Sequence, residues 1–117
     1  MNLSLENKVA LVTGGSRGIG RAIALGLARS GADVIVASRK IDDLEKVATE
    51  IKALGRKSLA VATHIGRLDE IKNLVEKSEA QFGRIDILVN NAATNPSMAA
   101  AIDIDDRAWD SIMNLNL

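Results

Sequence analysis

The residues best suited to chemistry form a glycine-rich segment near the start of the chain, Thr13–Gly20 (TGGSRGIG). Glycines at this spacing allow a tight turn and a close approach of the backbone to a ligand. A helix that begins here directs its unpaired N–H groups and the positive end of its dipole at an anion, which makes the segment a candidate phosphate loop. The alternative is a glycine-rich turn without a ligand, and a Walker-type loop is excluded because no Gly-Lys-Ser/Thr follows. The residues predicted to bind the ligand are Gly14, Ser16, Arg17, Gly18, Ile19 and Gly20.

A second candidate group, Ser38-Arg39-Lys40, ends the apolar run Asp33–Ser38. If the ligand is a dinucleotide, an NAD site usually has Asp or Glu here, about 20 residues past the glycines, to bind the ribose 2′-hydroxyl. This chain has no carboxylate there, whereas the planar guanidinium of Arg39 suits a 2′-phosphate, and Arg17 can reach the same region. We therefore predict that Ser38 and Arg39 contribute to binding NADP(H) in preference to NAD(H). The alternative is that Arg39 and Lys40 are solvated loop charges.

The composition excludes several other kinds of site. The 117 residues include no cysteine and one histidine, His64, which excludes disulfides, thiolate metal sites and histidine-based metal clusters. Lys plus Arg and Asp plus Glu number 15 each, so no net charge attracts nucleic acid or an anionic membrane. The first residues lack the features of a signal peptide, and no apolar run approaches the ~20 residues of a membrane span. We expect a cytoplasmic protein with no metal, nucleic acid or membrane as partner.

Short apolar runs alternate with helical patterns along the chain, and these elements must position the candidate residues. The runs are apolar on both alternations, which is typical of strands buried on both faces of a parallel sheet. The first three helical stripes end at glycines suited to the left-handed position after a helix, namely Gly31, Gly55 and Gly83. The predicted strands are Val9–Thr13, Asp33–Ser38, Ser58–Thr63 and Ile85–Asn90.

This alternation predicts an α/β fold with right-handed crossovers, a Rossmann-type doubly wound parallel sheet with strand order 3-2-1-4. A fourth helix is predicted to begin near Asp105 and to be still running at Leu117. Residues 1–117 are therefore interpreted as one dinucleotide-binding domain that is incomplete at its C-terminus. Only the first half of the sheet is expected, which would leave Ile85–Asn90 as an unpaired edge.

Asn116 is a candidate at the end of the chain. It lies four residues after Ile112 and seven after Trp109, so on the predicted fourth helix it shares the apolar stripe that faces the sheet. A buried amide without partners costs about 1–3 kcal/mol, so this side chain needs hydrogen bonds. Two interpretations stay open at this point: a structural asparagine bonded to the backbone, or a residue of an active site.

Three motifs in this order resemble those of the short-chain dehydrogenase/reductase family. The glycine spacing Thr13-Gly14-x-x-x-Gly18-x-Gly20 is the first. The second is Asn90-Asn91-Ala92-Ala93, where the family has Asn-Asn-Ala-Gly, and the third is the stretch 109–116 (WDSIMNLN), which is similar to the family's fourth helix. The resemblance covers essentially the whole chain and implies the Rossmann-type fold predicted above.

The resemblance also implies roles for further residues. Asn90 and Ala92 are implied to contact the cofactor, and Asn116 is implied to be catalytic, because the family's asparagine positions a water that connects to a catalytic lysine. His64 stands where most members have an Asp that hydrogen-bonds adenine, and Ile65 belongs to the same contact. A neutral imidazole can accept or donate one bond there. The alternative is a surface histidine without a role.

The reaction that the resemblance implies is direct hydride transfer between the nicotinamide C4 and a carbonyl or alcohol carbon of a small molecule. A tyrosine, a lysine and a serine assist it. Within the family, His64-Ile65-Gly66 and Ser38-Arg39-Lys40 look like the corresponding segments of NADPH-dependent carbonyl and retinal reductases. The Tyr-x-x-x-Lys motif and the serine follow the fourth helix, and these 117 residues contain no tyrosine. We therefore expect the 117-residue chain alone to be inactive, and the full-length protein to form a homo-oligomer, either a dimer or a tetramer.

Other functions remain open at the level of the sequence. One is a β-ketoacyl-carrier-protein reductase, which belongs to the same family. If Leu117 is the natural terminus, the chain would instead be a non-catalytic fragment that binds NADP(H), or an assembly fragment that completes its sheet with another chain.

Overall fold

The structure, a computed structural model, describes residues 4–14, 18–91 and 113–116. Strands and helices alternate from the first strand to the fourth, as the sequence predicts, and a fifth strand follows. The strands are β1 Val9–Thr13, β2 Asp33–Ser38, β3 Ser58–Ala62, β4 Ile87–Asn90 and β5 Met113–Asn116. The helices are α1 Gly18–Arg29, α2 Ile41–Ala53 and α3 Leu68–Phe82.

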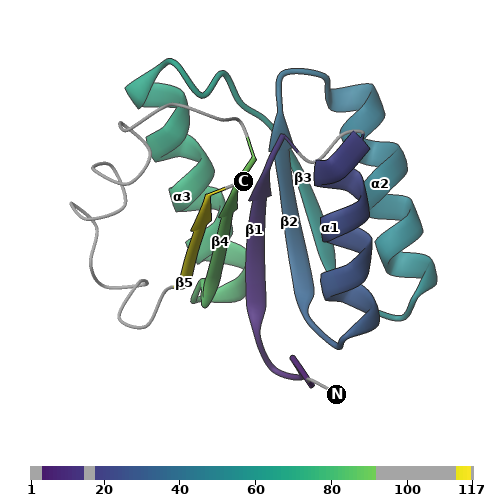
Figure 1. The fold of residues 1–117 in the computed structure, drawn as a ribbon. Coiled ribbons are helices and arrows are strands. Elements are labelled where there is room, and N and C mark those ends of the chain that lie inside the picture. Colours follow the sequence, from purple (N-terminus) through teal and green to yellow (C-terminus); the bar gives the residue numbers. More distant parts are fainter. Residues whose placement is uncertain (1–3, 15–17, 92–112, 117) are drawn as a thin grey trace.

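The strands form one parallel sheet in the order β3-β2-β1-β4-β5, so the predicted order 3-2-1-4 is confirmed. β1 lies in the interior of the sheet, where Ala10 pairs with Val34 of β2 on one side and with Ile87 of β4 on the other. Figure 1 shows α1 and α2 on one face of the sheet and α3 on the other. The predicted Rossmann-type, doubly wound architecture is therefore present.

Alternate side chains of β1 pack into two separate cores. Val9 and Leu11 belong to the core under α3, whereas Ala10 and Val12 belong to the core under α1 and α2. Because helices cover both faces, all five residues of β1 are buried. This two-sided burial is the reason that the strands appear in the sequence as continuous apolar runs.

The ends of several elements agree with the sequence within two residues. β3 ends at Ala62 instead of Thr63, and β4 begins at Ile87 instead of Ile85. The glycines expected after the first three helices have positive φ angles, as predicted. At the end of α3, Gly83 has φ of +76° and its N–H donates to the carbonyl of Glu79 at 2.8 Å.

Residues 113–116 form strand β5, so the prediction that the fourth helix runs through them is wrong. Met113–Asn116 pairs in parallel with β4, with Met113 opposite Ile87 and Asn116 opposite Asn90. Residues 105–112, where this helix was predicted to begin, lie outside the described residues. A strand in this place satisfies the backbone groups along one side of β4, and an apolar spacing over so few residues does not outweigh that gain. β4 is consequently an inner strand, and β5 is the outermost strand on this side among the described residues.

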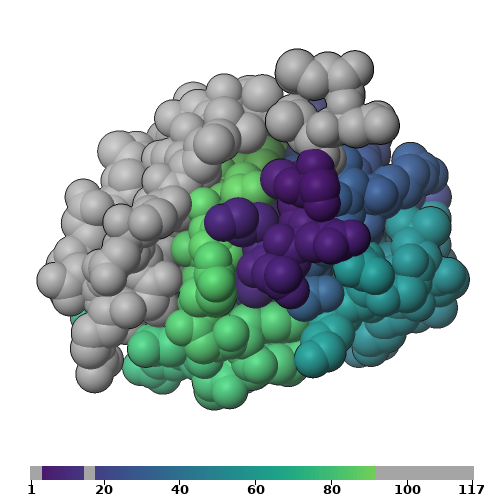
Figure 2. Space-filling model, turned by 90° about the horizontal axis from the view of Figure 1, so that it is seen from below, coloured from purple at the N-terminus to yellow at the C-terminus, as the bar shows by residue number. Residues whose placement is uncertain are grey.

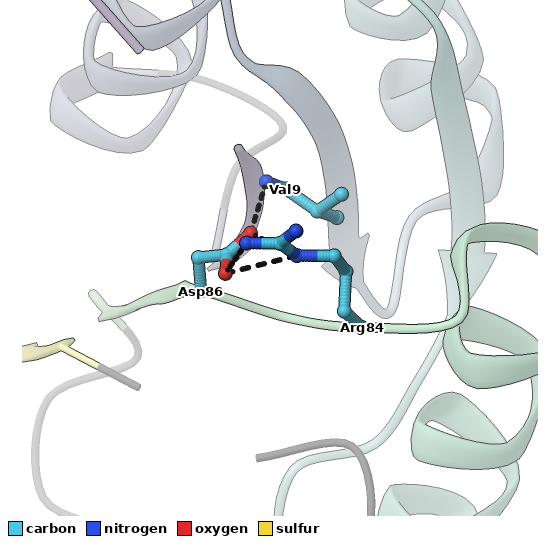
Figure 3. A network of polar contacts seen from close by, with 3 residues as sticks. All are labelled: Val9, Arg84 and Asp86. Atoms are coloured by element: carbon cyan, nitrogen blue, oxygen red, sulfur yellow. Dashed lines mark hydrogen bonds and ion pairs between the residues drawn. The ribbon is translucent and has the colours of Figure 1, made fainter. Parts of the chain in front are cut away.

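The amino edge of the sheet, where the strands begin, is closed around Asp86. Its N–H donates to the carbonyl of Val9 at 2.8 Å, and its carboxylate accepts the N–H of Val9 at 2.8 Å. The guanidinium of Arg84 binds the same carboxylate, with Nε 2.9 and 3.0 Å from its two oxygens (Figure 3). Burial raises the pKa of Asp86, but the hydrogen bonds from Arg84 and Val9 outweigh it, so the pKa lies below its usual value.

Other bonds at the amino edge likewise join loops to strands. Asp33 Oδ1 accepts the N–H of Lys57 at 2.9 Å, and Arg56 Nη1 donates to the carbonyl of Gly31 at 3.2 Å. Figure 2 looks at this end of the molecule and shows the N-terminal residues (purple) against the green residues that lead into β4. The amino edge is therefore held by bonds within the chain itself.

Candidate functional site

Predicted site residues from four strands meet at the carboxyl edge of the sheet, where the strands end. The N–H of Gly14, just after β1, donates to the carbonyl of Ala37 in β2 at 2.7 Å. The N–H of Thr63, just after β3, donates to the carbonyl of Ser38 at 2.7 Å. β4 ends on the opposite side of β1, with Asn90. Open α/β sheets bind their ligands at this edge, so these residues lie where a ligand of such a sheet would bind.

The glycine loop is shaped by two glycines with different constraints. A Cβ on Gly20 would lie 2.0 Å from the carbonyl oxygen of Gly14 and 2.8 Å from Nδ2 of Asn91, so no side chain fits. Gly18 has φ of +62°, which disfavours other residues, but its Cβ would meet nothing within 4 Å. Gly20 therefore lets α1 approach β1 closely, and Gly18 leaves open space at the start of the helix.

The start of α1 offers a site for an anion. The first N–H groups of a helix have no acceptor within it, and α1 has no acidic residue in its first turn to neutralise the positive end of its dipole. Ile19 is 68% exposed although it is a large apolar residue. An exposed apolar side chain beside free N–H groups and the open space at Gly18 fits a nucleotide with phosphate groups.

Thr13 and Asn91 support the site, although the sequence did not single them out as contacts. Thr13 is wholly buried, and its Oγ1 donates to Oδ1 of Asn90 at 3.0 Å. Because Oδ1 accepts this bond, Nδ2 of Asn90 is the group left to donate. Asn91 Nδ2 lies 3.4 Å from the carbonyl oxygen of Gly14, which links the end of β4 to the glycine loop. A polar residue that ends an otherwise apolar strand is the signal that could have identified Thr13.

The end of β2 carries two exposed cations. Arg39 and Lys40 are exposed, and Ser38 is half-buried, with its Oγ accepting the N–H of Lys40 at 3.2 Å. Within the part of the chain that the structure describes, Arg39 has no hydrogen bond or ion pair from its side chain. The guanidinium lies at the carboxyl edge with its donors available to a ligand.

His64 begins the turn between β3 and α3, at the same edge. Its Nδ1 accepts the N–H of Gly66 at 3.0 Å, and its own N–H donates to Oε1 of Glu70 at 2.8 Å. The other oxygen of Glu70 lies 3.4 Å from Nη1 of Arg67. Ile65 is half-buried and packs against the core under α3. His64 is therefore built into a local network, half-exposed at the surface.

The remaining predicted contacts divide into two groups. Ser16, Arg17 and Ala92 lie outside the described residues. Asn116 lies at the end of β5, in register with Asn90, so it reaches the carboxyl edge as a strand residue and not on a helical stripe.

Clusters of metal ligands and membrane-spanning helices are both absent from the ranges 4–14, 18–91 and 113–116. No group of three or more His, Cys, Asp or Glu residues there could hold a metal ion. None of the helices in these ranges is long and apolar enough to cross a membrane.

Comparison with known proteins identifies a family. Residues 8–117 match the family model described as short chain dehydrogenase. The chain is 40% identical over 113 residues to dehydrogenase/reductase SDR family member 4 of Sus scrofa. It is 41% identical over 114 residues to 2-dehydro-3-deoxy-D-gluconate 5-dehydrogenase of Escherichia coli (strain K12). These matches cover 97% of this chain but 40% and 44% of the relatives, so the chain spans about two-fifths of their length.

Two solved structures have a similar fold. L-sorbose reductase from Gluconobacter frateurii, complexed with NADPH and L-sorbose, is 39% identical with a TM-score of 0.76. 7α-Hydroxysteroid dehydrogenase, complexed with NADH and 7-oxo glycochenodeoxycholic acid, is 38% identical with a TM-score of 0.76. Each match covers 80% of this chain and 36% of the other. Similar structures thus include complexes with either nicotinamide cofactor.

Proposed function

Because the chain belongs to the short-chain dehydrogenase family, we propose that it is the cofactor-binding part of an NADP(H)-dependent oxidoreductase. The substrate class is a small molecule with a carbonyl or alcohol group, and the bound nicotinamide supplies or accepts the hydride. The observation that carries the choice of NADP(H) is the exposed Arg39 at the end of β2, with no carboxylate beside it. The similar structures hold NADPH or NADH, so the choice rests on this chain's own residues.

Different residues of the carboxyl edge bind different parts of the dinucleotide. The N–H groups at the start of α1, with Gly14, Ser16, Gly18, Ile19 and Gly20, bind and orient the pyrophosphate. Arg39, with Ser38 and Arg17, binds the 2′-phosphate through charge-assisted hydrogen bonds. Asn90 and Ala92 flank the nicotinamide, since β4 lies on the side of β1 away from β2.

The proposed catalytic contribution of the described residues is limited to Asn116. This residue shares the end of β5 with the end of β4, next to Asn90. We propose that its amide holds a water that takes part in proton transfer to the reacting oxygen. The tyrosine, lysine and serine of the family reaction have no counterpart assigned in these 117 residues, which contain no tyrosine. The 117-residue chain by itself is therefore expected to have no turnover.

The preference for NADPH is tested by exchanging the charge of Arg39. Titration calorimetry of the intact protein should give tighter binding of NADPH than NADH, and Arg39→Asp should reverse the order. One lost charge-assisted contact of about 1.5–3 kcal/mol corresponds to a change of about 10- to 150-fold. Arg29→Asp makes the same charge change at the exposed end of α1 and should leave the preference unaltered. Equal affinity of the unmodified protein for both cofactors would contradict the proposal.

Turnover is tested by following NADPH absorbance with a simple diketone or an aromatic aldehyde. The 117-residue chain should give no rate above buffer. Activity that survives repurification would mean that another acid replaces the tyrosine.

We further propose a cytoplasmic location and a homo-oligomer, a dimer or tetramer, for the full-length protein, which fractionation and sedimentation would test. No described residue favours the β-ketoacyl-carrier-protein reductase alternative.

A further inference from the structure

The ion pair between Arg21 and Glu50 joins two helices. Arg21 lies in the first turn of α1, and Glu50 lies in α2. The guanidinium binds the carboxylate at two points, with Nε 3.1 Å from Oε1 and Nη2 bonded to Oε2. The other two ion pairs among the described residues join positions two or three apart in the sequence. In this part of the chain, the Arg21–Glu50 pair is therefore the one that ties two separate elements together.

The apolar contact of α1 leaves room for this helix to shift along its neighbour. Both helices pack into the same core on one face of the sheet (Figure 1). Three of the four residues that α1 buries are glycine or alanine, namely Gly20, Ala24 and Ala28. Helices are held in register when side chains of one fit between those of the other, and small residues form low ridges that resist sliding less. A two-point contact between long side chains therefore has a larger part in setting the position of α1 along α2.

The relative position of the two helices matters for a ligand with two phosphate sites. The N–H groups at the start of α1 are one candidate phosphate site, and Arg39, which precedes α2, is the other. The N–H of Gly14 donates to the carbonyl of Ala37 at 2.7 Å and thereby joins the ends of β1 and β2. This bond does not hold the helix itself, because α1 begins beyond it, at Gly18. The span between the two phosphate sites therefore depends on how α1 lies against α2.

We propose that Arg21 and Glu50 are positioning residues for NADP(H), whose ion pair holds α1 and α2 at the spacing at which one dinucleotide reaches both phosphate sites. This inference rests on the proposed function. NADH carries the pyrophosphate alone, so its binding does not depend on this spacing, whereas NADPH also carries the 2′-phosphate. The side chains of Arg21 and Glu50 are 45% and 38% exposed, so water screens the pair and it adds little to stability. Loss of the pair should consequently change the cofactor preference more than the fold.

Calorimetry of the intact protein with NADPH and NADH tests the role of the pair. Arg21→Gln and Glu50→Gln should each lower the ratio of NADPH affinity to NADH affinity by about threefold, which is the size expected of one exposed ion pair. The double exchange Arg21→Glu with Glu50→Arg should restore the ratio, because the pair forms again with its charges reversed. Circular dichroism should stay native in all three variants.

Glu45→Gln is the matched control in the same helix. It removes the same charge from an exposed position of α2 that lies nearer to Arg39. Simple charge repulsion predicts that both Glu45→Gln and Glu50→Gln raise the NADPH to NADH ratio, whereas the positioning role predicts a fall in Glu50→Gln alone. A rise in the affinity of Glu50→Gln for both cofactors would mean that the carboxylate only withholds Arg21 from the phosphates, and it would overturn the inference. No binding of either cofactor to the unmodified protein would overturn the proposed function and the positioning role together.

The spacing of the helices can also be measured without any cofactor. Spin labels on Ala22→Cys in α1 and Ala53→Cys in α2 occupy exposed positions and change no charge. Pulsed electron paramagnetic resonance should give a narrow distribution of label distances, which Glu50→Gln should broaden and Glu45→Gln should not. An unchanged distribution in Glu50→Gln would overturn the inference whether or not a dinucleotide binds.

Discussion

The two edges of the sheet are built from the same strands but use their polar groups differently. At the amino edge, the carboxylate of Asp86 binds the N–H of Val9 and the guanidinium of Arg84, and Asp33 binds the N–H of Lys57. Each of these side chains has its partner within the chain. At the carboxyl edge, Arg39 is exposed and has no side-chain partner among the described residues.

The sequence has polar residues near both edges of the sheet, so the presence of polar residues does not indicate which edge binds a ligand. The difference lies in whether the polar groups are already satisfied, because an occupied donor or acceptor contributes to stability and an unoccupied one is available for recognition. Substitutions at the two edges should consequently separate stability from binding.

The largest effect is expected at Gly20, because the contact is with backbone atoms. In Gly20→Ala the new Cβ must displace the carbonyl of Gly14, from which it would lie 2.0 Å. We expect a loss of stability of about 1–3 kcal/mol from overpacking. Affinity for NADPH should fall by about 100-fold, the equivalent of one or two charge-assisted hydrogen bonds. Urea unfolding and calorimetry would measure the two effects.

Gly26→Ala is the matched control within the same helix. A Cβ on Gly26 would meet nothing within 4 Å, so the substitution adds no contact. Alanine in place of glycine inside a helix should raise the free energy of unfolding by about 0.5–1 kcal/mol and leave NADPH affinity unchanged. Equal effects of the two substitutions on binding would mean that the close approach of α1 to β1 does not shape the site.

An intermediate effect, confined to stability, is expected at the amino edge. Asp86→Ala leaves the N–H of the buried Val9 without its acceptor and should lower the free energy of unfolding by about 1–3 kcal/mol. The ratio of NADPH to NADH affinity should not change. Glu76→Ala, at an exposed position of α3, should alter stability by less than about 0.5 kcal/mol. A changed cofactor preference in Asp86→Ala would show that the two edges are not independent.

The smallest effect is expected in the pH dependence of stability, to which the carboxylate of Asp86 contributes. The pKa of Asp86 in the folded protein lies below the value of about 3.9 of a free aspartate, so the carboxylate stabilises the fold fully above about pH 4. This contribution is lost as the pH falls through the lower, folded-state pKa. Asp86→Asn should therefore be less stable than the unmodified protein at neutral pH, with the difference shrinking in acid. A difference that stays constant between neutral pH and pH 3 would contradict this assignment.

The sequence predicts the strands well because each of them is buried on both faces. Val9–Thr13 and Asp33–Ser38 have the predicted bounds, and the glycine segment opens α1 at Gly18. The start of β4 is less predictable, since Asp86 turns its main chain and side chain toward Val9 instead of extending the strand. The position at which β4 begins therefore depends on the contact of Asp86 with Val9, which lies 77 positions away in the sequence.

The candidate site is only partly predictable for the same reason. Residue types and spacing indicate the glycine loop and Arg39, because their chemistry is local to one turn. The bond between Thr13 and Asn90 spans 77 positions, and no pattern in the sequence indicates it. The prediction that Met113–Asn116 is helical is wrong, because helical spacing in the sequence does not show that the neighbouring strand β4 has unpaired backbone groups.

The interior position of β1 governs how its amides exchange with solvent. Because β1 pairs with β2 on one side and with β4 on the other, its amide hydrogens are released only when the whole sheet opens. The amides around Leu11 should therefore exchange at a rate set by the global free energy of unfolding. In the part of the chain that the structure describes, β3 pairs with a strand on one side only, so its amides should exchange through smaller, local openings. Deuterium uptake at β1 thus reports the stability of the entire domain, and a dinucleotide that binds the folded state will slow this uptake by the factor by which it stabilises the fold.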